Sequence, residues 1–591
     1  MFVRVAPDVV KIEKTYWYKT TQETKDAEKI VVGSIVRVNI NGRKTKGWVC
    51  EICESIDSLA DSGNSIDLEK IKEVIEYVSD GPPGHIVELC ESLSSQYLFS
   101  PVAFLRASSP NRIINNLSRG NLLRGSSFSK NLILVDPRAD RRSIIQAHLA
   151  VNGTTLVVTP ESQTKFSQWL ETLGKRVVNF GLSETVTPDI YRSATRESSV
   201  IIGGRKSLFA PTSDAKSIII LDDSYEQLQE ERSPQWKSID VAVQICEQRS
   251  IPLTVISSVP TTSTYGFKTT DLRSKEPAWP KIYIDDKTKA DPALGIFSRE
   301  IISSIHESIK ANLNCGIILN NKAASNLLSC QTCKSIAVCE NCEHCVSQIS
   351  EVEETFHCFN CKTERAIVCL ECKGTTFKKL KKGIPSIVQE CQKMFPKYRV
   401  EELKKETKTQ DNHHDDIPTL YVGTEAIFHS KLLRKSLGSV IFIDFDTMLF
   451  RNSQTAFNQC LVIVNRAQRM LVKSSVKIPL ILSTRVPQNP IVLDLSKNDF
   501  VSNMKRDLDL CRELKLAPFY ATLKIESQTQ AIKELSKTID KEFVVGIQEN
   551  GEKSSLMIRA QNHSELFENC GTRIRSFIAR NRCSTSVDQY D

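Results

Sequence analysis

The stretch 330-CQTCKSIAVCENC-342, continued by 358-CFNC-361 and 369-CLEC-372, contains four Cys-x-x-Cys pairs. Two thiolates at this spacing can bind one metal ion from a single tight turn, and two such turns complete a tetrahedral site with no open position. The four pairs therefore predict two structural zinc sites, and spacing alone leaves the pairing of the turns open. The eight predicted ligands are Cys330, Cys333, Cys339, Cys342, Cys358, Cys361, Cys369 and Cys372.

Metal binding is expected to help this stretch fold. Nine of the nineteen cysteines lie between Cys330 and Cys372, in a segment too short to bury a stabilising core of its own. In such a segment, the binding of a metal ion supplies much of the folding free energy. Cys345 is the ninth cysteine of the stretch and is not needed as a ligand.

Strand-sized apolar runs alternate with helix-length segments on both sides of the cysteines. The earlier runs are at residues 132–135, 156–159, 200–202, 218–221 and 253–257, and the later ones at 315–319, 420–422, 440–444 and 480–483. This alternation predicts two α/β lobes, each built on a parallel sheet. The cysteines interrupt the second set of runs, so we expect them to form an insertion in the second lobe.

The two ends of the chain differ from its middle. Residues 1–60 alternate apolar and polar side chains and contain Asn41-Gly42, a hairpin signal, whereas Leu68, Ile71 and Val74 have helical spacing. We predict a multidomain α/β protein with a β-rich domain (1–107, helical over 67–107), a linker (108–130), lobe 1 (131–290), lobe 2 (291–500, insertion 328–376) and an α+β domain (501–591).

Composition excludes several classes of protein. The 591 residues are 40% hydrophobic and 25% charged, unlike disordered, collagen-like or small disulfide-stapled chains. The net charge of +8 permits a nucleic-acid partner without establishing one. The first residues lack the apolar core of a signal peptide, and no run approaches the roughly 18 apolar residues of a membrane helix. We expect a cytoplasmic protein with no membrane partner, in which clustered cysteines bind metal.

Three further motifs follow one another along the chain. Val200-Ile-Ile-Gly-Gly-Arg-Lys-Ser-Leu-Phe-Ala-Pro211 is similar to a segment IGTRSALFAP, Ser257-Ser-Val-Pro-Thr-Thr-Ser263 to GSATPS, and Val422-Gly-Thr-Glu-Ala426 to GTQM. With the eight inserted cysteines, they resemble the replication-restart protein PriA (primosomal protein N′) family. The resemblance implies a DNA 3′-end-binding domain, two RecA-like helicase lobes and a two-zinc insertion. It also implies that Cys330/Cys333 share one ion with Cys369/Cys372, and Cys339/Cys342 the other with Cys358/Cys361.

In this chain, the segment that corresponds to the family's phosphate-binding loop is altered. Such a loop needs glycines whose backbone N–H groups surround the phosphates, a Lys that reaches them and a Ser or Thr that binds Mg²⁺. The corresponding residues are Asp136-Pro-Arg-Ala-Asp-Arg-Arg-Ser143, and no glycine lies between Gly125 and Gly153. Arg142 and Ser143 could imitate the Lys and Thr, but without the glycines we expect no phosphate binding.

Two more ATPase motifs are altered. Asp222-Asp-Ser-Tyr225 replaces Asp-Glu-Glu-His, so that Asp222 could still meet Mg²⁺ while Asp223 is shorter than the Glu that activates water. Arg466 and Arg469 keep the spacing of the family's arginine motif without its glycines. For these two arginines, we favour a position on a solvated basic face of a helix over a role in sensing phosphate. The three altered motifs together predict no catalytic residue and argue against ATP and Mg²⁺ as cofactors.

Aromatic and basic residues are candidate DNA contacts. The resemblance implies that Tyr16-Trp17-Tyr18 faces a DNA 3′ end, where rings can stack on a base, and sheet packing is the alternative. In the hairpin, Arg43, Lys44 and Lys46 suit phosphate contact, or else form a solvated turn. The basic residues after the last cysteine pair, which lie beside Phe377, suit single-stranded DNA: Lys378, Lys379, Lys381 and Lys382.

Three functions are compatible with these features. The favoured one is a primosome component that binds forked DNA and recruits the loader of the replicative helicase without helicase activity. The alternative is an active ATP-dependent 3′–5′ DNA helicase with an unorthodox nucleotide site. The third is a zinc scaffold that binds proteins instead of DNA.

Overall fold

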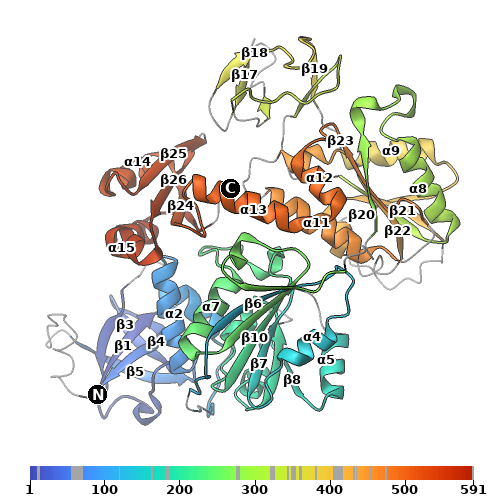
Figure 1. Cartoon of the computed structure of the whole chain (residues 1–591). Helices are drawn as coiled ribbons and strands as arrows, with labels where there is room; N and C mark the ends of the chain where they lie inside the picture. Colours follow the sequence, from blue (N-terminus) through green and yellow to red (C-terminus); the bar gives the residue numbers. More distant parts are fainter. Residues whose placement is uncertain are drawn as a thin grey trace.

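The computed structural model describes most of the chain (Figure 1). The described residues are 1–9, 14–54, 71–118, 120, 122–160, 164–181, 186–274, 280–319, 327–341, 345–347, 355–358, 363–379, 383–403, 417–429, 433, 436–450, 456–472, 476–550 and 552–588. Figure 1 shows the N-terminal domain beside a first sheet, a second sheet above it, the cysteine-rich segment at the top and the C-terminal domain at the left. None of the helices in these ranges is long and apolar enough to cross a membrane.

A closed five-stranded barrel forms the N-terminal domain. Its strands, in the order β1-β2-β5-β3-β4, are β1 (Phe2–Pro7), β2 (Tyr16–Lys19), β5 (Lys72–Ser79), β3 (Ile35–Ile40) and β4 (Arg43–Cys53). Ile40 pairs with Arg43 across the two-residue turn Asn41-Gly42, in which both residues have positive φ. The hairpin predicted from this dipeptide is therefore confirmed.

The helical prediction for residues 67–107 is half wrong. Residues 72–79 form β5, because Val74 pairs with Val38 of β3 and closes the barrel. Leu68 lies outside the described residues. The helices begin later, at α2 (Gly84–Gln96) and α3 (Pro101–Ser108). Spacing of apolar residues alone could not reveal the strand, since pairing with a distant segment decides its conformation.

The first sheet has seven strands, and all its pairings are parallel. Their order is β12 (Lys268–Asp271), β6 (Ser129–Leu134), β11 (Pro252–Ser257), β10 (Ala215–Leu221), β7 (Thr154–Val158), β9 (Ser199–Gly203) and β8 (Arg176–Asn179). The connecting helices are α4 (Arg142–His148), α5 (Thr164–Thr172), α6 (Pro188–Ser193) and α7 (Ser238–Arg249). Buried clusters lie on both faces, which explains why the central strands β11, β10, β7 and β9 appear as apolar runs, whereas the edge strand β12 is polar and exposed.

The second sheet has six parallel strands. Their order is β13 (Ile282–Asp286), β23 (Leu480–Thr484), β22 (Leu437–Phe442), β14 (Asn314–Ile318), β21 (Thr419–Gly423) and β20 (Arg399–Leu403). Its helices are α8 (Arg299–Lys310), α9 (Ile384–Met394), α10 (Asp446–Leu449), α11 (Ala456–Met470) and α12 (Pro490–Lys497). Because β13 pairs with β23, the second lobe takes in residues that the sequence boundary at 290/291 assigned to the first.

The cysteine-rich segment lies between β14 and α9, inside the second lobe. Its strands are β15 (Leu328–Cys330), β16 (Val346–Ser347), β17 (Thr355–Cys358), β18 (Glu364–Ala366) and β19 (Phe377–Lys379). β15 pairs with β19 and so brings the two ends of the segment together. A small buried cluster that includes Phe356 is its only apolar core within the described ranges.

The C-terminal domain follows α13 (Phe500–Glu513) and holds a four-stranded sheet of order β25-β26-β24-β27. Its elements are β24 (Ala521–Gln528), α14 (Thr529–Thr538), β25 (Val544–Asn550), β26 (Lys553–Ala560), α15 (His563–Arg580) and β27 (Ser584–Val587). Buried side chains of this domain, of α2 and α3, and of one face of the first sheet form a single continuous core. Short 3-10 helices complete the fold: η1 (Ala27–Lys29), η3 (Arg205–Phe209), η4 (Glu226–Leu228), η5 (Thr262–Thr264), η6 (Lys287–Lys289), η7 (Pro292–Leu294) and η8 (Glu425–His429).

Candidate functional site

Four cysteines converge at the two ends of the inserted segment. The Sγ atoms of Cys330, Cys333, Cys369 and Cys372 all lie within 4.8 Å of one another. Cys330 Sγ lies 3.5 Å from Cys372 Sγ, and Cys333 Sγ 3.5 Å from Cys369 Sγ. A zinc ion with bonds of about 2.3 Å to four thiolates would hold them roughly 3.8 Å apart. These four thiols therefore fit a metal ion.

The surroundings of two of these thiols, Cys330 and Cys369, favour the ionised form, whereas at Cys372 the neighbouring thiols outweigh the backbone N–H of Gly374 and raise the pKa to about 11. Burial raises the pKa of Cys369, but the backbone N–H of Cys372 and the hydroxyl of Ser335 outweigh it and bring the pKa to about 6. For Cys330, backbone N–H groups of Cys333 and Thr332 likewise overcome the effect of burial and lower the pKa. Because the thiolate is the form that binds a metal, this turn geometry is suited to one.

The inner pairs of cysteines are described only in part. Cys339 and Cys358 are buried, and Cys345 lies close enough to Cys358 for the two to interact electrostatically. The other two predicted ligands, Cys342 and Cys361, lie outside the described residues. The inner ligand set consequently stays a prediction.

The segment after β6, where a phosphate-binding loop was expected, is held by ion pairs. The guanidinium of Arg141 donates to the two carboxylate oxygens of Asp222 at 2.7 and 3.0 Å, and to Ser258 Oγ at 3.1 Å. Asp222 directly follows β10 and is only 4% exposed. Arg141 was not among the predicted site residues, although its neighbours were.

A second arginine reaches Asp222 from the other lobe. Arg469 Nη1, on α11, donates to Asp222 Oδ2 at 2.6 Å and to the hydroxyl of Tyr225 at 3.1 Å. Burial raises the pKa of Asp222, but the charges of Arg141 and Arg469 overcome it and hold the pKa at about 2. We call these three residues the Asp222 cluster; it joins the first sheet to the second lobe.

Other contacts extend this junction between the lobes. The guanidinium of Arg466 stacks 4.0 Å above the ring centre of Tyr225, and Arg138 Nε donates to the carbonyl oxygen of Gln468 at 2.9 Å. The favoured prediction of a solvated basic helix face is therefore wrong, since Arg466 is buried and Arg469 is paired. A helical spacing of charges cannot show what packs against that face.

The remaining nucleotide-site candidates Arg142, Ser143 and Asp223 are placed differently. Arg142 pairs with Asp140 at 2.7 Å on the exposed surface, and Ser143 is exposed. Asp223 Oδ2 instead accepts a hydrogen bond from Thr261 at 2.6 Å, and burial raises the pKa of Asp223 to about 6. Arg142 and Ser143 are thus not brought together with Asp222.

The aromatic residues of β2 fall on two faces of the barrel. Tyr16 is 41% exposed and Trp17 is partly exposed, whereas Tyr18 is 3% exposed and packs in the barrel core. The burial of Tyr18 contradicts a DNA contact by this ring and favours the sheet-packing alternative. Tyr16 lies on the same face of β2 but pairs only with β1, whereas Tyr18 is flanked by both β1 and β5 and is covered by the barrel core. Tyr16 and Trp17 stay available on the outside.

The basic candidates lie on strands and turns. Arg43, Lys44 and Lys46 are exposed on β4, next to the hairpin turn. Lys378 is exposed on β19, which also contains Lys379, whereas Phe377 packs edge-on against Phe356 at 4.9 Å. The other two basic candidates, Lys381 and Lys382, lie outside the described residues.

Two comparisons relate this chain to known proteins. The family model of the PriA 3′ DNA-binding domain (3′BD) matches residues 4–110, the barrel with α2 and α3. Replication restart protein PriA of Bacillus subtilis (strain 168) is 21% identical over 388 residues, which cover 62% of this chain and 48% of that protein. The chain thus spans about half the length of this curated relative. Both comparisons therefore find similarity to PriA, a replication restart protein.

Proposed function

We propose that this protein acts in replication restart by binding forked or single-stranded DNA without turning over ATP. In this proposal, the two parallel sheets are the RecA-like lobes of a helicase core whose nucleotide site has been lost. The observation that carries it is the Asp222 cluster, which occupies the carboxyl end of β10 between the two lobes.

The contacts of Asp222 argue against a bound nucleotide. To meet Mg²⁺, this buried carboxylate would have to exchange its two guanidinium partners for the ion. The segment 136–143 offers no glycine to surround phosphates. Its Arg138 bonds to Gln468 of the second lobe, and its Arg141 bonds to Asp222 within the first lobe. Mg-ATP binding would require this whole junction to open.

The DNA-binding part of the proposal rests on the N-terminal domain. This domain matches the 3′ DNA-binding domain. Contact with a DNA end is also favoured by the exposed ring of Tyr16 and by the exposed basic side chains of Arg43, Lys44 and Lys46. We further propose that the DNA-bound protein recruits the loader of the replicative helicase and other primosome proteins.

Two zinc ions complete the proposal. The converged thiols of Cys330, Cys333, Cys369 and Cys372 support one ion, as the family resemblance implies. The second would be held by Cys339 and Cys358 with Cys342 and Cys361. Both ions would stabilise the inserted segment without taking part in a reaction.

The test is an ATPase assay with forked DNA, combined with fluorescence anisotropy of the same fork. We expect no ATP turnover, together with fork binding that weakens steeply as salt concentration rises, because phosphate contacts release counterions. ATP hydrolysis that Asp222→Asn abolishes would instead establish the active helicase. Absent or salt-insensitive fork binding would favour the protein-binding scaffold.

A further inference from the structure

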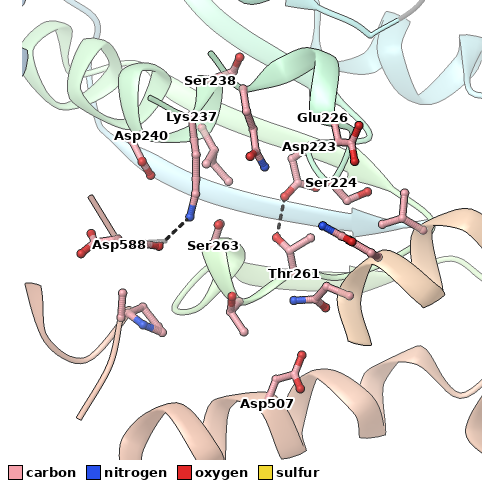
Figure 2. Close-up of a pocket in the computed structure, with 18 of the residues that line it drawn as sticks. Asp223, Ser224, Glu226, Lys237, Ser238, Asp240, Thr261, Ser263, Asp507 and Asp588 are labelled. Atoms are coloured by element: carbon pink, nitrogen blue, oxygen red, sulfur yellow. Dashed lines mark hydrogen bonds between the residues drawn. The ribbon is translucent and has the colours of Figure 1, made fainter. Parts of the chain in front are cut away.

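A pocket of about 300 Å³ lies between the lobes and the C-terminal part of the chain (Figure 2). Its walls come from the segments that follow β10 and β11, from the start of α7, from α11 and from α13. Asp223 and Arg466 of the altered ATPase motifs line it, but residues 136–143, Asp222 and Arg469 do not, so the pocket lies beside the segment that corresponds to the phosphate-binding loop and not at it. A cavity of this size is at the lower end of the range that holds small ligands.

The pocket is acidic. Six carboxyl groups line it against two cationic side chains: Asp223, Glu226, Asp240, Glu425, Asp507 and Asp588 against Lys237 and Arg466. Both cations already have partners, because Lys237 Nζ donates to the carbonyl oxygen of Asp588 at 3.1 Å and Arg466 stacks on Tyr225. Such a lining repels phosphate groups and favours a cationic ligand.

Two buried oxygen atoms of the pocket residues lack hydrogen-bond donors. Asp223 is 9% exposed, and while its Oδ2 accepts from Thr261, its Oδ1 has no partner among the described residues. Asn458 Oδ1, on α11, is also without one there. A buried acceptor without a donor is costly, so these atoms indicate a ligand that carries N–H groups.

The distribution of carboxyl groups indicates the shape of that ligand. Figure 2 shows Asp223 and Asp507 on opposite walls of the pocket. Within the described ranges, the carboxyl groups of this pocket do not form a group that could hold a metal ion, as the four converged cysteines do. Apolar side chains of Val462, Ile463 and Leu510 complete the lining. Separated anionic groups with apolar surface beside them suit an aliphatic chain with a charged amine at each end.

We propose that this pocket binds a small linear polyamine, with one ammonium group donating to Asp223 and another lying near Asp507. The polyamine would bridge α13 and the segments that follow β10 and β11. This site goes beyond the DNA-binding role proposed above and does not depend on it.

The test is isothermal titration of the full-length chain with spermidine in the absence of DNA. We expect saturable binding of one molecule per chain, weakened at least tenfold in the double variant Asp223→Asn, Asp507→Asn. Asp509→Asn is the matched control, because this exposed carboxyl lies on the same helix, bonds to Arg512 and does not line the pocket. Its affinity should equal that of the unmodified protein.

A second variant controls for misfolding of the double variant. Leu510 is 37% exposed at the pocket wall, so Leu510→Arg should place a guanidinium in the pocket and block spermidine while the fold is kept. No saturable heat, or equal affinity in the double variant, would overturn the proposal. So would competition by Mg²⁺ at similar concentration, which would indicate a metal site. Fork binding, measured on the same samples, reports separately on the proposed function.

Discussion

Asp222 carries a full charge in the interior because two guanidinium groups face it. Its oxygens accept from Arg141 and Arg469, and each arginine has a further oxygen partner, in Ser258 and Tyr225 respectively. A buried charge is tolerated only when its hydrogen bonds are satisfied, and removing one member leaves the others unpaired. Asp222 is therefore the residue at which damage to the junction between the lobes should be largest.

The free energy of unfolding should depend on pH through the carboxylate of Asp222. Its pKa is about 2 in the folded chain against 3.8 in the unfolded one, so the carboxylate stabilises the fold above about pH 4 and this contribution is lost as the pH falls towards 2. Asp222→Asn should lower the free energy of unfolding at pH 7 by about 2 kcal/mol, measured in urea.

The matched control is Asp189→Asn, whose carboxyl is 92% exposed and pairs with Arg192. It should change the free energy of unfolding by less than about 0.5 kcal/mol. The difference in free energy of unfolding between the Asp222 variant and the unmodified protein should shrink between pH 4 and pH 2. A constant difference over this range would contradict the low pKa assigned to Asp222.

Substitutions of Tyr16 and Tyr18 should have separate effects, the first on DNA binding and the second on folding. Tyr16→Ala removes an exposed ring and should weaken binding of a DNA 3′ end by roughly 1–3 kcal/mol with the melting temperature unchanged. Tyr18→Ala opens a cavity in the barrel core and should destabilise the protein by about 3 kcal/mol. Equal DNA binding by Tyr16→Ala and the unmodified chain would remove Tyr16 from the interface.

At the scale of elements, strands buried on both faces were predictable and partly exposed ones were not. The strands of the two sheets appear as apolar runs because helices cover both faces, as with Ile218–Leu221. β5 was missed because only Val74 and Ser79 of its eight residues are buried. The spacing of the cysteines predicted metal sites but left the pairing of the turns open, and the convergence of the outer four agrees with the set implied by the family resemblance. The contact of Arg141 with Asp222 could not be predicted, because it depends on how the segment after β6 packs against the end of β10.

Metal removal should affect one segment only. The described part of the cysteine-rich segment has a small apolar core around Phe356, so a strong chelator should make the region between β15 and β19 sensitive to protease while both sheets stay folded. Metal analysis of the released ions should give two zinc per chain. One ion, or unchanged resistance to protease in this region, would count against the proposed ligand sets.

At the scale of the whole molecule, the Asp222 cluster links two lobes that have separate buried cores. In a double-mutant cycle of Asp222→Ala and Arg469→Ala, unfolding in urea should give a coupling energy of about 1–3 kcal/mol. The exposed pair Asp140 and Arg142 provides the control and should show no measurable coupling. Additive effects in the first cycle would mean that the pair does not hold the lobes together.

The same reasoning predicts that opening the junction does not create an ATPase. Arg469→Ala frees one side of Asp222, yet residues 136–143 still lack glycine. A labelled ATP analogue should therefore fail to crosslink to this variant, as to the unmodified protein. Crosslinking by the variant alone would show that the arginine blocks an otherwise intact site.

The continuous core beneath the barrel limits how this protein can be divided. Tyr97 of the N-terminal domain donates to Asp240 of α7 at 2.8 Å, and Tyr191 of the first lobe donates to the carbonyl oxygen of Ser108 at 3.0 Å. Residues 4–110 expressed alone would expose the apolar sides of α2 and α3 to water and should aggregate. The N-terminal domain is therefore not an independent unit: recombination that exchanges it between relatives would have to exchange the surface of the first lobe that it packs against as well.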